Sequence, residues 1–193
     1  DGTFDATYNT GALAAGAPAS QRGLDVGSGY NTICPDGTCL ITGSSPGSSF
    51  TRCNGYPVRP VGSDRTIIRI AQDGSLVSQV AQGTQFTQPV AATRNYQAVQ
   101  PDGSIICVGS FTDYNGTSVG RLIRIDQFGA VDTAFVANNG TGFDNQTMGV
   151  DMFPSGYIMV GGTPGNFDGV AHGGLVRLLA DGTRDTTFDL GGA

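Results

Sequence analysis

The sequence predicts an all-β chain, a β-propeller-like array of three blade repeats with mainly antiparallel strands and little or no helix. Three observations predict this fold. One turn-and-strand pattern recurs along the chain, each recurrence has the size of a propeller blade, and the composition disfavours helices. A stacked β-solenoid and an irregular β-sandwich are the alternatives, although solenoid coils are usually shorter than these repeats.

The repeat is visible first at the two ends of the sequence. Residues 1–8 read DGTFDATY and residues 181–188 read DGTRDTTF, so the chain ends in the phase in which it begins. Four glycines mark that phase along the chain: Gly2, Gly74, Gly129 and Gly182. Their spacings of 72, 55 and 53 residues indicate three repeats, the first of which carries an insertion of about 18 residues.

These spacings predict one repeat array over residues 1–193. The expected bounds are about 3–74 for repeat 1, 75–129 for repeat 2 and 130–182 for repeat 3, with 183–193 as the start of a next repeat or a latch strand. Propellers close with about four to eight blades, so three repeats do not close alone. We therefore expect either a piece of a longer polypeptide or a chain that associates with copies or partners.

Each repeat contains a tight turn between two apolar runs. The turns are Pro35-Asp36-Gly37, Pro101-Asp102-Gly103 and Pro154-Ser155-Gly156. Proline fixes φ at the first corner of such a turn and glycine supplies the positive φ, so a hairpin is predicted at each. The continuous apolar run 105–108 suits a strand buried on both faces, and the alternating run 123–126 suits a strand with one wetter face.

Composition excludes several classes of protein. The chain contains no Lys, Glu or Trp, and its charges come from 16 Asp and 10 Arg residues. Lys and Glu favour helices and Asp favours turns, which supports an all-β fold. The net charge of −6 and the absence of a basic cluster argue against nucleic-acid binding. No apolar run has the length of a membrane span.

The cysteines suggest one disulfide. Cys34 and Cys39 flank the first hairpin turn, where cross-strand neighbours come close to disulfide reach. Such a bond would imply an oxidising compartment outside the cytoplasm. Cys53 could compete for either partner, and Cys107 is expected to be a buried free thiol.

Arginine and aspartate recur once per repeat. The recurring residues are Arg69, Arg124 and Arg177 together with Asp5, Asp132 and Asp185. Positions that recur with the blade are usually architectural, and arginine can hold a carboxylate with two bonds. We expect these side chains to tie turns or neighbouring blades together, with a functional role as the alternative.

No constellation for catalysis stands out, so we expect no catalytic residue and no enzymatic activity, with a hydrolase as a minor alternative. The single histidine, His172, lies in a predicted loop and is expected to be solvated. Residues 113–116 and 166–169 place side-chain oxygens next to glycine, which could bind calcium. An Asx-turn is the favoured explanation, so we expect no metal and no cofactor.

A family likeness appears in the order of residues 101–135, PDGSIICVGSFTDYNGTSVGRLIRIDQFGAVDTAF. It resembles the delta-60 repeat, a β-propeller repeat of bacterial surface proteins and phage tail proteins. That pattern runs from Pro-Asp-Gly through a Tyr-Asn-Gly turn and Arg-Leu to Asp-Gly and Asp-Thr-Phe. Repeat 3 shares it at residues 160–162, 181–182 and 185–188.

Repeat 1 departs from this pattern. Cys53 replaces the tyrosine, residues 56–64 are inserted, and residues 77–80 replace the Asp-Thr-Phe element. The resemblance implies a propeller fold and an extracellular or virion setting, and it implies no catalytic residues.

These expectations combine into a function. We expect a non-enzymatic structural or assembly module of an extracellular bacterial structure or a phage virion, as a tail or tail-associated component. Its partners would be other proteins or copies of itself that complete the blade array, and a host-surface glycan or receptor. The alternative is an adhesin module that binds a glycan or receptor, although the chain has no Trp and its Tyr residues are scattered.

Overall fold

The structure is a computed structural model that describes residues 29–43, 52–53, 56–57, 67–81, 86–87 and 96–188. These residues form antiparallel sheets and one short helix, so the predicted all-β, mainly antiparallel fold class is confirmed. The chain divides into two compact units, residues 1–83 and residues 84–193, and each is described by itself.

The first unit contains a four-stranded antiparallel sheet, which we call blade 1. Its order is β1 (Gly29–Ile33), β2 (Cys39–Gly43), β5 (Ile67–Ile70) and β6 (Leu76–Ala81). A separate hairpin pairs β3 (Arg52–Cys53) with β4 (Tyr56–Pro57). Ile68 and Ile70 are buried on one face of blade 1, with Cys39, Ile41 and Leu76 packed against them.

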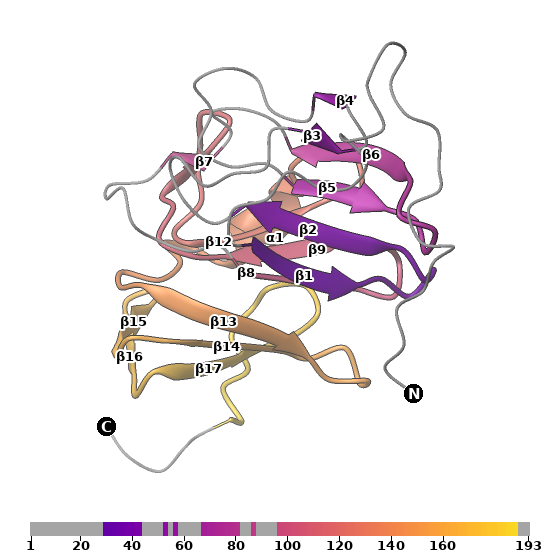
Figure 1. Cartoon of the computed structure of the whole chain (residues 1–193). Helices are drawn as coiled ribbons and strands as arrows, with labels where there is room; N and C mark the ends of the chain where they lie inside the picture. Colours follow the sequence, from indigo (N-terminus) through magenta and orange to yellow (C-terminus); the bar gives the residue numbers. More distant parts are fainter. Residues whose placement is uncertain are drawn as a thin grey trace. The chain divides into compact units, whose positions relative to one another are not determined.

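The second unit contains two three-stranded sheets. Blade 2 consists of β8 (Tyr96–Val99), β9 (Ile105–Val108) and β12 (Leu122–Ile125). Blade 3 consists of β13 (Thr147–Met152), β14 (Ile158–Gly162) and β17 (Leu175–Leu178). The two sheets lie as layers (Figure 1) and enclose one core, to which blade 2 gives Ile106, Val108 and Leu122 and blade 3 gives Ile158, Val160, Val176 and Leu178.

A small hairpin accompanies each of these two blades. In one, β10 (Asp113–Tyr114) and β11 (Thr117–Ser118) pair, and β7 (Phe86–Thr87) joins β10. In the other, β15 (Gly165–Phe167) pairs with β16 (Val170–His172). Asn115-Gly116 and Asp168-Gly169 form the two-residue turns, and all four residues have positive φ, as hairpin turns of this length require.

The three predicted hairpin turns share one geometry. In blade 1 the Cys34 N–H donates to the Thr38 carbonyl at 2.8 Å and the Gly37 N–H to the Cys34 carbonyl at 2.9 Å. The same two bonds recur at 100–104 and 153–157. Gly37, Gly103 and Gly156 have φ of 81°, 88° and 90°, which identifies a type I turn followed by a glycine bulge.

The sheets do not begin and end at the sequence bounds of the repeats. Gly74 lies in the turn between β5 and β6, inside blade 1. Gly129 and Gly182 occupy the matching turns after β12 and β17, each followed by one isolated bridge, Ile125 to Val131 and Leu178 to Arg184. The recurring glycine therefore marks the turn after the third strand of each blade and does not mark the boundary between blades.

The structure does not contain the expected Cys34–Cys39 disulfide: both thiols are free. The bulged turn places Ile33 opposite Cys39, whereas Cys34 hydrogen-bonds to Thr38. Cys107 is a buried free thiol, and burial raises its pKa to about 12. The side chain of Cys53 lies outside the described residues.

One element was not foreseen at its position, the helix α1 (Thr133–Asn138) after blade 2. Asp132 is its N-cap, and its carboxylate accepts a hydrogen bond from the Phe135 N–H at 3.0 Å. Phe135 is fully buried in the core between blades 2 and 3. The cap and this one buried ring fix a helix too short for a periodic sequence pattern.

The hairpin turns allow a test of glycine's role. A Cβ at Gly103 would meet no atom within 4 Å, so Gly103→Ala introduces only the strain of a positive φ. We expect it to lower the free energy of unfolding by about 1 kcal/mol, measured by urea denaturation. Gly149→Ala is the matched control, because that site is equally open and its φ is not positive; it should be neutral or slightly stabilising. Equal losses in both variants would contradict this account.

Candidate functional site

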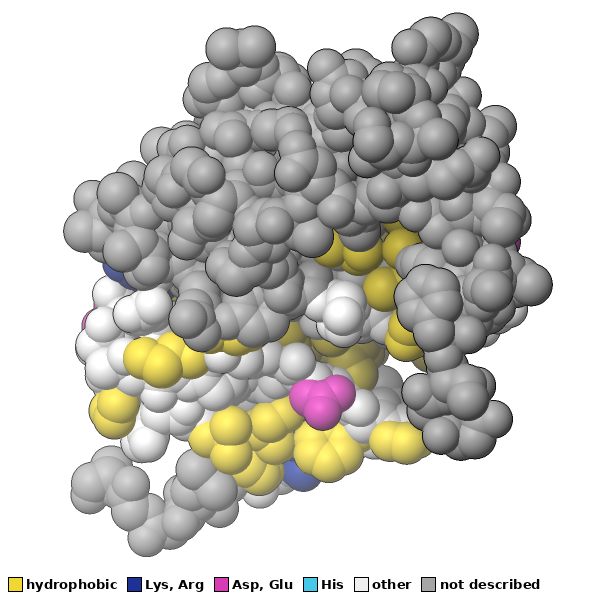
Figure 2. All heavy atoms as spheres, in the orientation of Figure 1, with side chains coloured by type: hydrophobic (Ala, Val, Ile, Leu, Met, Phe, Trp, Pro, Cys, Tyr) yellow, Lys and Arg dark blue, Asp and Glu magenta, His cyan; other side chains and the backbone are white. Residues whose placement is uncertain are grey.

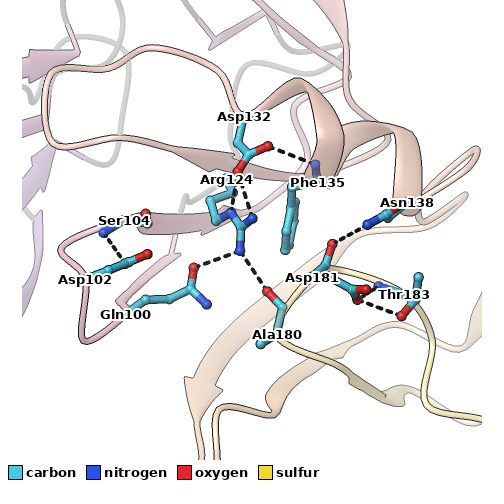
Figure 3. Close-up of polar contacts among 10 residues, drawn as sticks. All are labelled: Gln100, Asp102, Ser104, Arg124, Asp132, Phe135, Asn138, Ala180, Asp181 and Thr183. Carbon is cyan, nitrogen blue, oxygen red and sulfur yellow. Dashed lines mark hydrogen bonds and ion pairs between the residues drawn. The ribbon is translucent and has the colours of Figure 1, made fainter.

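Arg124 of β12 is the centre of a polar network between blades 2 and 3 (Figure 3). Its Nε and Nη2 donate to Asp132 Oδ2 at 2.9 and 2.7 Å. The other carboxylate oxygen of Asp132 caps α1 at Phe135. The pKa of Asp132 is lowered, first by the bond from the Phe135 N–H and then by Arg124. One carboxylate thus fixes both the arginine and the helix.

The same arginine reaches across to blade 3. Its Nη1 donates to the Ala180 carbonyl at 2.7 Å, in the turn after β17, and to Gln100 Oε1 at 3.2 Å. The guanidinium lies 4.6 Å from the Phe135 ring centroid, within cation–π range. Asn138 adds a bond to the Asp181 carbonyl of that turn at 2.9 Å (Figure 3). Arg124 therefore joins the end of blade 2 to a turn of blade 3.

Arg177 occupies the matching place in blade 3. Its Nε and Nη2 each lie 2.7 Å from Asp185 Oδ2, and its guanidinium lies 4.7 Å from the ring centroids of both Tyr157 and Phe188. Its Nη1 has no hydrogen-bond partner among the described residues. Phe153 stands where blade 2 has Gln100, so the acceptor side chain is absent there.

The sheet face that carries this arginine is called here the Arg face. In blade 2 it presents Ile106, Val108 and Leu122 beside Arg124, and these three aliphatic side chains are fully buried against blade 3. The paired positions of blade 3 are Met159, Gly161, Leu175 and Arg177, and each is partly exposed. Figure 2 shows hydrophobic side chains at the surface in the lower part of the view, where Figure 1 places blade 3.

Arg69 of blade 1 has a different environment from its counterparts. Its Nη1 donates to Asp36 Oδ2 at 3.1 Å, and its Nε and Nη2 are buried without a hydrogen-bond partner among the described residues. Blade 1 continues into β6 where the other two repeats place their aspartate, so the carboxylate is missing. Asp5, the remaining recurrent aspartate, lies outside the described residues.

A polar pocket of about 330 Å³ lies beside the two small hairpins of the second unit. Six polar side chains line it: Thr112, Ser118, Arg121, Thr141, Asp144 and Asn166. Backbone packing is tight among its lining residues, because a Cβ at Gly120 would lie 2.3 Å from the Thr141 carbonyl oxygen. The sequence did not indicate this pocket, since its residues come from three segments that are separate in the sequence.

Arg121 and Asp144 give this pocket its charges. Arg121 has φ of 64°, where blade 3 has Gly174, and its Nη1 donates to the Phe143 carbonyl at 2.7 Å. Asp144 accepts from the Asn166 backbone N–H at 2.7 Å and from Asn166 Nδ2 at 2.6 Å. These bonds lower the pKa of Asp144, so it stays ionised at neutral pH. The pocket offers donors, acceptors and one charge of each sign.

The proposed calcium positions have their oxygens engaged locally. Asp113 accepts from the Gly116 N–H at 2.8 Å, and Asp168 accepts from the Thr141 N–H at 3.0 Å. Within the described ranges, no group of three His, Cys, Asp or Glu residues could hold a metal ion.

His172 accepts from the Gly174 N–H at 3.1 Å, and partial burial lowers its pKa.

No helix in the described part of the chain is long and apolar enough to cross a membrane.

Comparison with known proteins supports a propeller-repeat family. A family model described as "Domain of unknown function (DUF5122) beta-propeller" matches residues 100–135 and 154–188, in blades 2 and 3. No curated protein matches the chain. A solved structure described as that of the "putative gluconolactonase in protein family" matches with 16% identity and a TM-score of 0.43. The match covers 82% of this chain and 47% of that one, so the chain spans about half of its length.

One expectation is contradicted by these comparisons. The sequence led us to expect a protein that is not an enzyme, but the matched structure is described as a gluconolactonase, which is an enzyme. We therefore withdraw that expectation. Its weakness is physical: a propeller scaffold is compatible with many activities, and a scarcity of histidine does not exclude them. At this identity and TM-score, the match itself transfers no reaction and no residue.

The fork between Arg124 and Asp132 can be tested with Arg124→Lys. Lysine keeps the charge but cannot make two bonds to Asp132 and one to Ala180 together, so we expect a loss of about 1–2 kcal/mol of unfolding free energy. Arg184→Lys is the control, because the Arg184 side chain donates to the Val170 and Ala171 carbonyls in an exposed hairpin and makes no ion pair among the described residues. An equal effect in the two variants, measured by urea denaturation, would contradict a special role for Arg124.

The lowered pKa of Asp132 predicts a pH dependence. The folded pKa lies below the unfolded value of about 3.9, so the unfolded chain binds the proton first as the pH falls, and this stabilisation is lost below about pH 4. Asp132→Asn keeps a capping oxygen but removes the titrating group. We expect the variant to be less stable than the wild type at pH 7 and to lose less stability between pH 5 and pH 3. Parallel curves for the two proteins would rule out this contribution.

Proposed function

We propose that this chain is a structural assembly module of an extracellular bacterial structure or a phage virion, as a tail or tail-associated component. The observation that carries the proposal is the Arg face of blade 3. Its counterpart on blade 2 is covered by a neighbouring blade, whereas Met159 and Leu175 are partly exposed beside Arg177. A face that packs against another blade in one repeat but is partly exposed in the next is typical of a component that binds another protein.

The contact between blades 2 and 3 supports this proposal by showing how such a face is used. Three aliphatic side chains are buried in it, and Arg124 adds one bond to a backbone carbonyl of the neighbouring turn. The contact needs no particular side chain at that acceptor, because the acceptor is backbone. Any blade with an aliphatic face and a turn equivalent to residues 179–183 could therefore cover the Arg face of blade 3.

The resemblance of the repeat supports the proposed location of the protein. The propeller-repeat match includes the regions whose order resembles the delta-60 repeat, and we propose that the chain is of this kind. That repeat occurs in bacterial surface and phage tail proteins, so we propose an extracellular or virion location. Protein partners or copies of the chain would complete the blade array.

A second candidate function, a module that binds a glycan or receptor, rests on the polar pocket. Arg121, Asp144, Asn166 and nearby hydroxyl groups provide donors and acceptors in a small space. Arg121 has a positive φ at a position where blade 3 has glycine, so its backbone is strained. Such strain beside a pocket is often associated with a functional site. A neutral polyhydroxyl ligand suits a site that contains one cation and one anion.

The assembly proposal predicts the location of the protein and the surface through which it is incorporated. Immunogold electron microscopy of the source should label extracellular structures or virions. Leu175→Asp places a charge on the Arg face of blade 3 and should lower incorporation by about tenfold or more, because an unpaired charge would be buried in the contact. Val170→Asp is the control, since Val170 is 55% exposed on β16. Label confined to the cytoplasm would overturn the proposal.

The glycan candidate is tested on a glycan array with the wild type, Arg121→Gly and Asn166→Ala. Glycine accepts the positive φ at position 121, so this variant removes the guanidinium without adding backbone strain. Binding of a neutral glycan should fall at least about tenfold in both variants, because each loses hydrogen bonds to the ligand. An array without wild-type signal, or a signal unchanged in both variants, would dismiss this candidate.

A further inference from the structure

The Arg face of blade 3 extends onto β13, where it carries an acidic residue. The register pairs Asp151 with Met159 and Met159 with Arg177, so these three side chains form one row across the sheet. Asp151 is exposed and makes no ion pair among the described residues, where Arg177 Nη1 likewise has no hydrogen-bond partner. The row therefore has an anion at one end and a cation at the other, and each end can make a further bond.

The next row of the same face is raised at one end and low at the other. Gly149 pairs with Gly161, and Gly161 pairs with Leu175. A Cβ at Gly161 would lie 3.7 Å from Leu175 Cδ1, so the leucine projects beside the middle strand. A Cβ at Gly149 would meet no atom within 4 Å, so there is room for a side chain above β13. The row thus has a projecting side chain on β17 and open space on β13.

Both features are particular to blade 3. Counted from the shared hairpin turn, blade 2 has Ala98 in place of Asp151 and Tyr96 in place of Gly149. Tyr96 packs against the core between blades 2 and 3, as a residue in a covered contact does. Blade 3 therefore differs from blade 2 at the two positions that give its Arg face an anion and an open space.

Apolar side chains adjoin these two rows at the end of the sheet. Phe153 takes the place of Gln100, which bonds to Arg124 on the Arg face of blade 2. Leu179 follows Leu178, whose side chain lies in the core, so alternation places Leu179 on the Arg-face side. The two residues are 44% and 38% exposed. Figure 2 shows hydrophobic side chains beside an acidic one in the lower part of the view, as expected for a surface that another protein covers.

We propose that the Arg face of blade 3 binds the same face in a second copy of this chain, an inference that rests on the proposed assembly function. The two sheets stack face to face with nearly aligned strands, and a two-fold axis runs between them parallel to β14. Such an axis exchanges the two outer strands and keeps the position along each strand. Asp151 of each copy then lies opposite Arg177 of the other, and its carboxylate accepts a hydrogen bond from Nη1.

The same symmetry fits the second row. Leu175 of each copy lies over Gly149 of the other, where there is room for its side chain, and Gly161 faces Gly161 without side chains that would keep the sheets apart. The Met159 side chains of the two copies meet at the axis. Every off-axis contact occurs twice, which is what an isologous interface requires. An isologous interface closes with two chains, so we expect a dimer with twice the 19.8 kDa mass of one chain.

The experiment measures mass by sedimentation velocity and light scattering over a series of concentrations. Gly149→Leu places a leucine opposite Leu175 of the other copy, and Leu175→Ala leaves the space at Gly149 unfilled. Each change acts twice in the dimer, so each should raise the dissociation constant by about tenfold or more. Val170→Asp, on β16 outside the Arg face, is the control and should remain dimeric. Urea denaturation of every variant shows that it is folded before its mass is interpreted.

Mixing the two variants tests the two-fold axis itself. A pair of one Gly149→Leu chain and one Leu175→Ala chain again sets a leucine opposite a small residue at both places. The mixture should therefore form a dimer at concentrations where neither variant does so alone. A wild type that stays monomeric up to its highest soluble concentration, a mass beyond that of a dimer, or a mixture that stays monomeric would overturn the inference.

The two proposals can fail separately. The proposed function would still stand if a monomeric wild type is incorporated into an extracellular structure or virion, because its partner would then be another protein. Label confined to the cytoplasm would overturn the proposed function, and the masses of the wild type and the variants would still decide whether the Arg face of blade 3 forms a dimer.

Discussion

The fork between an arginine and an aspartate is the interaction on which the arrangement of blades 2 and 3 depends. Arg124 is largely removed from water, so its guanidinium needs acceptors for several N–H groups at once. Asp132 supplies two of those bonds, and the remaining side of the fork is satisfied by Gln100 and by the Ala180 carbonyl of the next blade. Packing one blade on the next is therefore coupled to satisfying the hydrogen bonds of a largely buried cation.

The same requirement gives different results in the other two blades. In blade 3 the fork with Asp185 is complete and two aromatic ring centroids lie 4.7 Å from the guanidinium, but no carbonyl of a further blade is present among the described residues. In blade 1 the arginine is more buried and the aspartate of the fork is absent, so two of its nitrogens have no acceptor in the part of the chain that the structure describes. The recurring arginine therefore has all its acceptors in blade 2, lacks the carbonyl of a further blade in blade 3, and lacks the aspartate of the fork in blade 1.

The polar pocket depends on backbone packing of another kind. Gly120 and Gly142 approach so closely that a Cβ on either would overlap the other's backbone or that of Thr141. This contact sets the loop that contains Asp144 beside the loop that contains Arg121. Residues far apart in the sequence then share one space, where the bond from Arg121 to the Phe143 carbonyl holds the guanidinium in place.

The sequence by itself determined the turns, the strands and the repeat, because these depend on local chemistry. A Pro-Asp-Gly triplet sets its own dihedral angles, and a run such as IICV is buried wherever the sheet is packed. The recurrence of Arg124 and Arg177 was equally visible. The tertiary structure alone decided which carbonyl each guanidinium meets and which faces are covered. The helix after blade 2 belongs to this second group, since its six residues are fixed by a cap and by burial of Phe135. These features depend on contacts between distant segments, and such contacts leave no periodic signal in the sequence.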